Sequence, residues 1–183
     1  MRRDVVDGSM WAQGVGWLAA LLAFWAMTRQ TERSIKCWLF VHTVFYGLHF
    51  WLLGLPLAVL ANIIACLRIG ISIKSRSWFW VIVLSVLSVA AGVLPKLDGL
   101  APQEILPLVA SVVLTVTLFR FEGGAFRFGI FLGSLLWFVH NAFAGSWGGC
   151  ALEIGLSLAN LYGWFQSRKA VKTPTLRKPQ KGA

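Results

Sequence analysis

The stretch that decides the fold is His140-Asn141-Ala142-Phe143-Ala144-Gly145-Ser146-Trp147-Gly148-Gly149-Cys150-Ala151-Leu152-Glu153. It joins two apolar segments through a Gly-rich turn and places a histidine, an asparagine and a glutamate at or inside their ends. If these segments cross a bilayer, an ionisable side chain at that depth is costly unless it faces a cavity or a partner. Glu153 is therefore the residue whose position most needs a reason. An earlier stretch, His49-Phe50-Trp51-Leu52-Leu53-Gly54-Leu55-Pro56, has the same design about 91 residues before it.

The composition is that of an integral membrane protein. The chain has 183 residues, of which 57% are hydrophobic and 13% charged, whereas soluble domains carry about 25% charged residues. The 17 Lys and Arg residues outnumber the 7 Asp and Glu residues, and they fall in short loops and a tail, as is typical of a cytoplasmic membrane face. Nucleic acid is therefore not an expected partner. The three cysteines are scattered without a CxxC pair, which indicates neither a disulfide framework nor a zinc site.

Seven segments are long and apolar enough to be transmembrane helices, which need about 20 residues each. They cover approximately 10–28, 37–54, 56–74, 78–95, 103–119, 127–145 and 147–166. The turns at 54–56 and 145–149 are so short that the flanking helices must form antiparallel hairpins. The first segment lacks a small-residue cleavage site and is expected to be a retained span. Residues 1–166 form one transmembrane domain, and 167–183 are expected to be a disordered, basic cytoplasmic tail.

The distribution of basic residues predicts the orientation. The connections around 29–36, 74–77 and 120–127, together with the tail, carry 13 Lys and Arg residues, whereas the other face carries three. The positive-inside rule therefore predicts a periplasmic N-terminus and a cytoplasmic C-terminus in a bacterial inner membrane.

An offset of 91 residues aligns the first three spans with the last three. It pairs Lys36 with Arg127, His49 with His140, and Asn62 with Glu153, and it matches the basic first loops and the Gly turns. Both triplets start outside. The expected fold is an all-α bundle of seven transmembrane helices in a 3+1+3 plan of parallel repeats, with 10–74 as the first repeat, 78–95 as the linker and 103–166 as the second. Transporters built this way bind their substrate near the midplane.

Nine polar residues are candidates for a central site. Seven could line a cavity within the bundle, and two could form its outer mouth or gate: Glu153, Asn62, His49, His140, Asn141, Arg68 and Asn160, and then Gln13 and Glu104. Structural roles are the alternative for each kind of residue. The carboxylate could pair with the arginine or contact a histidine, the histidines could pack the hairpins, the asparagines could join helices, and the arginine could extend to the inner surface.

Enzymatic chemistry has no support in the sequence. No Walker motif, GxSxG, HExxH or Rossmann glycine run occurs, and no close spacing of ligands predicts a metal site. Neither a cofactor nor a metal is expected.

Several of these stretches resemble the bacterial inner-membrane YgjV family. They are Ala12-Gln13-Gly14-Val15-Gly16, His49 to Gly54, Arg68, and the block from His140 to Glu153, which is the most specific. The family is distantly similar to the SWEET and PQ-loop superfamily, which implies a 3+1+3 bundle and uniport or exchange by alternating access. In that superfamily an asparagine on the third helix of each repeat lines the sugar pocket, and the loose counterparts here are Asn62 and either Glu153 or Asn160. The proline-glutamine motif is missing from the first span, and Pro102-Gln103 only precedes the fifth.

Two functions follow as hypotheses. The first is a transporter or facilitator of a small polar solute, in which Glu153 or a histidine couples protons. The second is a non-transporting membrane scaffold or sensor, whose polar residues only join helices and whose tail binds anionic lipid. The duplication would let one chain enclose a pathway, so both a monomer and a homodimer fit the sequence.

Overall fold

The protein is helical throughout the part of the chain that the computed structural model describes, which is residues 2–96, 99, 102–143 and 147–172. The elements are α1 (Arg2–Met27), α2 (Glu32–Leu52), α3 (Pro56–Lys74), α4 (Trp78–Val93), the 3-10 turn η1 (Leu94–Lys96), α5 (Pro102–Arg120), α6 (Gly123–Phe143) and α7 (Trp147–Lys172). The prediction of an all-α protein is therefore confirmed.

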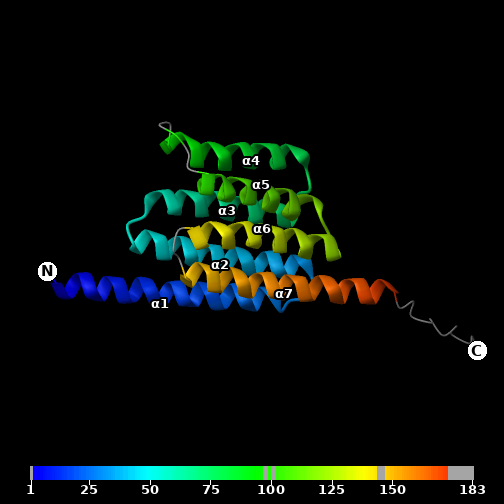
Figure 1. Cartoon of the computed structure of the whole chain (residues 1–183), viewed down its shortest axis with the longest axis horizontal. Coiled ribbons are helices and arrows are strands. Elements are labelled where there is room, and N and C mark those ends of the chain that lie inside the picture. Colours follow the sequence, from blue (N-terminus) through cyan, green and yellow to red (C-terminus); the bar gives the residue numbers. More distant parts are fainter. Residues whose placement is uncertain (1, 97–98, 100–101, 144–146, 173–183) are drawn as a thin grey trace, which may run out of the picture.

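The helices lie with their long axes nearly parallel, and consecutive helices run in opposite directions (Figure 1). The N-terminus and the α2–α3 turn lie at one end of the bundle. The α1–α2, α3–α4 and α5–α6 connections and the C-terminal part of α7 lie at the other (Figure 1). We call this second end the basic end, because it carries most of the described cations: Arg29, Arg33, Lys36, Lys74, Arg76, Arg120, Arg127 and Arg168.

Contacts between the helices follow the chain order and then close on themselves. Each helix packs against the next one along the chain, and in addition α1 packs against α7 and α3 against α5. Six helices therefore form a closed ring, α1-α2-α3-α5-α6-α7. The remaining helix, α4, packs on the outside of this ring against α3 and α5.

Local sequence explains where the helices begin and end. Thr31 caps α2 by accepting a hydrogen bond from the Ser34 amide at 3.3 Å, as N-cap hydroxyls do. Gly54 ends α2 at φ 68°, a left-handed conformation that glycine adopts without strain. The Gly54 amide donates to Trp51 O and the next amide donates to Phe50 O, which is the Schellman arrangement. Pro56 then starts α3, and the predicted antiparallel hairpin is confirmed.

Two glycines of α6 let it approach α5 closely. A Cβ at Gly129 would meet the side chain of Thr117, and one at Gly133 would meet the side chain of Leu114, both at under 3.0 Å. Small residues at such crossings allow helix backbones to pack tightly in membranes. Gly16 similarly faces the His49 ring, whereas Gly14 has nothing within 4 Å, so only one of these two glycines serves close packing.

The predicted spans each correspond to one helix, but their limits differ. Helices α2 and α6 begin at Glu32 and Gly123, before the predicted starts at 37 and 127. The first turn of each helix therefore lies in what was predicted to be a basic loop. Helix α7 continues past 166 to Lys172; residues 173–183 of the predicted tail and the predicted Gly145-Ser146 turn lie outside the described residues.

The apolar composition supports several membrane crossings. Three described helices are long and apolar enough to cross a membrane by themselves, at Met10–Met27, Trp78–Lys96 and Gly123–Phe143, and Ile105–Arg120 is a shorter apolar helix. Many large apolar side chains on the outside are exposed, among them Trp17, Trp78, Ile82 and Leu158, as expected of a surface in contact with lipid. The count of seven spans stays a prediction.

We predict that Gly129→Ala destabilises the bundle. The added methyl group would overlap the Thr117 side chain, and overpacking of this kind costs roughly 1–3 kcal/mol. The melting temperature in mild detergent should fall clearly below that of the wild type. Gly14→Ala is the matched control, since it places the same methyl group in open space in another helix. Equal melting temperatures for the two variants would show that α5 and α6 do not pack this closely.

Candidate functional site

Two cations, the buried Lys36 and the half-buried Arg127, tie the helices together at the basic end. Lys36, in the second turn of α2, donates through Nζ to Leu118 O at 2.6 Å and to Ser72 O at 3.3 Å. Arg127, in the second turn of α6, donates to Met27 O at 3.1 Å and to Arg29 O at 2.6 Å. All four acceptors are carbonyls at or just beyond the C-terminal ends of α5, α3 and α1, where backbone oxygens lack partners within their own helix. We call Lys36, Arg127 and these carbonyls the carbonyl clamp.

The two halves of the carbonyl clamp are related by the 91-residue offset. Lys36 corresponds to Arg127, and Met27, which accepts from Arg127, corresponds to Leu118, which accepts from Lys36. Each cation therefore reaches from the second helix of one predicted repeat to the end of the first helix of the other. The contacts are reciprocal, as a two-fold relation between the repeats would require.

Neighbouring contacts follow the same offset. Ser72, whose carbonyl faces Lys36, corresponds to Gly163, and the Arg127 guanidinium lies so close to Gly163 that a Cβ there would be 3.1 Å from its Nε. A Glu32 carboxylate oxygen accepts from the Gly123 amide, and these two residues are themselves 91 positions apart. This last contact lies where the two predicted repeats meet, and it places an anion at the N-terminus of α6, where the helix dipole favours it.

Arg68 is buried on α3, with 8% of its surface exposed. It is six residues before Lys74 and therefore about 9 Å from the basic end of its helix. One terminal nitrogen donates to Ser111 O at 3.0 Å and lies 3.4 Å from the Thr115 hydroxyl, both on α5. Its Nε is buried and has no hydrogen-bond partner among the described residues. The guanidinium is thus held by neutral groups and keeps unused hydrogen-bonding capacity.

Asn160 is fully buried on α7 near the carbonyl clamp. Its amide nitrogen lies 2.9 Å from Leu156 O and 2.9 Å from the Met27 sulfur. Its amide oxygen has no hydrogen-bond partner in the described part of the chain. Like Arg68, it combines a structural contact with an unsatisfied polar atom.

Glu153 lies in the interior, where three helices meet. The Ser134 side chain on α6 hydrogen-bonds its carboxyl group, and the Tyr46 hydroxyl on α2 is within electrostatic range of it. The sequence analysis singled out neither Ser134 nor Tyr46. The 91-residue offset could have indicated Ser134, because its counterpart Thr43 is also a buried hydroxyl residue.

The first-repeat histidines join α2 to α1. A ring nitrogen of His49 is 2.7 Å from Ala12 O, and one of His42 is 2.7 Å from Ala19 O. The Tyr46 ring stacks between them, with centroids 5.7 Å from His49 and 5.5 Å from His42. This ladder of three rings lies along one face of α2. Its geometry favours the packing role that was the alternative for His49.

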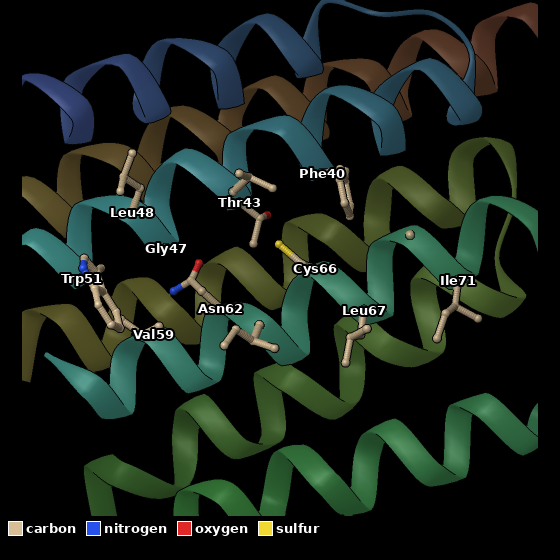
Figure 2. Close-up of a pocket in the computed structure, with 13 residues that line it drawn as sticks. Phe40, Thr43, Gly47, Leu48, Trp51, Val59, Asn62, Cys66, Leu67 and Ile71 are labelled. Carbon is tan, nitrogen blue, oxygen red and sulfur yellow. The ribbon is translucent and has the colours of Figure 1, made fainter.

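The other predicted site residues lie in separate places. Asn62 donates to Ala58 O one turn earlier and lies in a groove between α2 and α3 (Figure 2). His140 packs edge-on against Trp137, with centroids 5.6 Å apart, and Asn141 lies against Gly149 of α7. Gln13 is exposed, and the side chain of Glu104 lies outside the described residues.

The predicted cavity residues therefore fall into several groups. Arg68 and Asn160 lie toward the basic end, Glu153 faces Ser134 and Tyr46, His49 faces α1, and Asn62 lies in the α2–α3 groove. Lys36 and Arg127, which were predicted to lie in loops, are helical, and they bond to α3 and α5 and to the end of α1, respectively. Within the described chain, no group of three His, Cys, Asp or Glu side chains is close enough to hold a metal ion.

Comparison with known proteins identifies the family. Residues 10–170 match Imp-YgjV, a family described as bacterial inner membrane protein. The inner membrane protein YgjV of Escherichia coli (strain K12) is 33% identical over 149 residues, which cover 81% of this chain and 80% of that protein. No solved structure shows a significant match. Together with the apolar helices, these similarities show that the chain is a multi-pass protein of the bacterial inner membrane and belongs to the YgjV family.

Proposed function

We propose that the protein is an inner-membrane transporter or facilitator of a small anionic solute, working by alternating access between two three-helix repeats. The observation that carries this proposal is Arg68. A buried charge is costly unless it is paired, and within membranes such residues mark functional pathways by default. Among the described residues, the partners of Arg68 are neutral groups of α5, and its buried Nε has none. An anionic solute would supply a countercharge.

The surroundings of Arg68 favour an anion over a cation. Lys36 and Arg127 are also held by neutral carbonyl oxygens, so the basic half of the bundle carries two further positive charges near Arg68, one buried and one half-buried. Potentials from clustered charges of one sign attract solutes of the opposite sign. Asn160, with its unpaired amide oxygen, adds a polar group that could hydrogen-bond a solute beside these cations.

The reciprocal contacts support the repeat architecture of this proposal. Residues 10–74 and 103–166 would be parallel repeats related by a two-fold axis, with α4 as the linker outside the ring. In such transporters the repeats rock against each other around a midplane site. The carbonyl clamp would then be the closed gate at the basic end. Glu153, beside Ser134 and Tyr46, would be the residue that couples protons.

A scaffold or sensor is the second candidate function. The contacts of His49, His42 and the carbonyl clamp favour it, since these polar groups already bond to backbone oxygens. Such a protein would bind no solute, and its polar residues would contribute only to stability. Solute binding therefore distinguishes the two functions.

We expect anions to stabilise the purified protein, and Arg68→Gln to abolish this effect. A thermal-shift panel should compare carboxylates, phosphate and sulfate with neutral sugars and amines. A solute at 100 times its Kd adds about 2.7 kcal/mol of stability, which shifts the melting temperature measurably. Arg168→Gln, which removes an exposed arginine of α7, is the control and should keep the shift.

A hit should then be tested by counterflow in proteoliposomes, with wild type and Arg68→Lys in parallel. If no anion shifts the wild-type melting temperature and Arg68→Gln melts well below the wild type without any solute, Arg68 has a structural role. That result would favour the scaffold function. A shift that survives in Arg68→Gln would place the solute elsewhere.

The carbonyl clamp should contribute strongly to stability. Hydrogen bonds to charged groups contribute about 1.5–3 kcal/mol each, and the carbonyls would lose partners that water cannot replace within the bundle. Lys36→Met and Arg127→Met should each lower the melting temperature, and Lys36→Arg should recover part of the loss. Arg33→Met is the control, because Arg33 is exposed on the same helix as Lys36. A loss in the control as large as in Lys36→Met would contradict this role.

The basic end should face the cytoplasm. Positive charges are retained on that side during insertion, and this end carries the connections rich in Lys and Arg. Green fluorescent protein fused to the C-terminus should fluoresce, and alkaline phosphatase inserted at Gly54 should be active. Inactive phosphatase at Gly54 with an active C-terminal phosphatase fusion would reverse the orientation.

A further inference from the structure

An apolar groove of about 650 Å³ runs along the outside of the first repeat, between α2 and α3 (Figure 2). One wall is formed by successive turns of α2 and the other by successive turns of α3, from Trp51 and Val59 at one end to Phe40 and Ile71 at the other. Its two hydrogen-bonding side chains, Thr43 and Asn62, add little polarity. The Thr43 hydroxyl donates to Leu39 O and the Asn62 amide to Ala58 O, so both donors turn to their own helix.

Two glycines, Gly47 and Gly70, line the groove, and their counterparts at the 91-residue offset are the larger Phe138 and Leu161. On α2 the groove extends over 12 residues, from Phe40 to Trp51, or about 16 Å. This is close to half of the roughly 30 Å hydrocarbon core of a bilayer, which is the depth of one leaflet.

Two exposed cations stand just beyond the basic end of the groove. Lys74 is three residues past Ile71 on α3. Arg33 lies seven residues before Phe40 on α2, a spacing that puts both on one face of that helix. Both side chains are exposed, and among the described residues neither has a hydrogen bond or an ion pair. An apolar groove as long as one leaflet is deep, with two exposed cations beyond one end, complements a molecule that has an anionic head and a hydrocarbon tail.

We propose that the α2–α3 groove holds one acyl chain of an anionic phospholipid whose phosphate binds Arg33 and Lys74. The lipid belongs to the leaflet at the basic end. Its glycerol backbone lies along the helix surface between the two cations and Phe40. A second copy of the chain is the competing occupant. The groove fits it less well, because the two cations at the mouth would require an acidic partner and the outer surface of the described helices is predominantly apolar.

Native mass spectrometry of the full-length protein in mild detergent tests this site, with phosphatidylglycerol and phosphatidylcholine of identical acyl chains as probes. The wild type should bind one phosphatidylglycerol several-fold more tightly than phosphatidylcholine. Arg33→Gln/Lys74→Gln should weaken phosphatidylglycerol binding about tenfold or more and abolish the preference, because each basic residue near an anionic headgroup contributes appreciably. Arg29→Gln/Arg168→Gln, which removes two other cations of the basic end, should leave the preference intact.

A second pair of variants tests the acyl chain. Val44→Trp fills the groove from a position that is 49% exposed, and should remove tight binding of both lipids. Leu135→Trp is the control at the matching position of the second repeat, which is 42% exposed, and should bind as the wild type does. Melting temperatures of all variants verify that they are folded.

Three results would overturn the proposal. Equal binding of the two lipids by the wild type would show that the cations do not hold a phosphate. Equal losses in Val44→Trp and Leu135→Trp would show that the groove is not the site. A wild-type dimer that becomes a monomer in Val44→Trp would assign the groove to a second copy of the chain.

Discussion

Hydrogen bonds from the buried Lys36 and the half-buried Arg127 to the carbonyl ends of neighbouring helices hold the basic end of this bundle together. The last carbonyls of a helix have no partner in their own helix, and where they are buried they need a donor from another part of the chain. Lys36 and Arg127 supply these bonds across the ring, from α2 to α5 and from α6 to α1. The carbonyls gain donors and the cations gain acceptors, so these bonds join α2 to α5 and α6 to α1.

Much of the fold could be predicted, because hydropathy and turn residues act locally. Apolar segments predicted each helix, and Gly54 followed by Pro56 predicted the first hairpin. The predicted starts of α2 and α6 lie too far along the chain, because a charged residue such as Lys36 interrupts the apolar pattern that marks a span. The backbone remains helical there because the cation finds carbonyls on other helices, which is a tertiary effect that no local pattern contains. The 91-residue offset, however, did pair Lys36 with Arg127 before their contacts were known.

The candidate site was harder to predict than the fold. Distance along a helix gives the depth of a residue, but the direction of its side chain depends on how the helix is rotated against its neighbours. Asn62 and Glu153 correspond in the two repeats, yet Asn62 lies in the outer groove and Glu153 meets Ser134 and Tyr46. His49 likewise has the expected depth but bonds to α1. Burial of Arg68 without a countercharge could not be predicted either, because it depends on α5, which is distant in sequence.

Differences between residues 91 positions apart separate structural roles from functional ones. Where two such residues make the same kind of contact, as Lys36 and Arg127 do, the contact serves the packing of the bundle. Where they differ, assembly alone does not explain the residue. Ile69 is an apolar core residue, but its counterpart Asn160 is a buried amide with an unpaired oxygen. Gly47 lines the groove, whereas its counterpart is Phe138, and the counterpart of Arg68 is Ala159. A buried polar side chain or an unfilled space costs stability. Positions where only one of two residues 91 apart has such a feature are therefore where solute and lipid recognition should be sought.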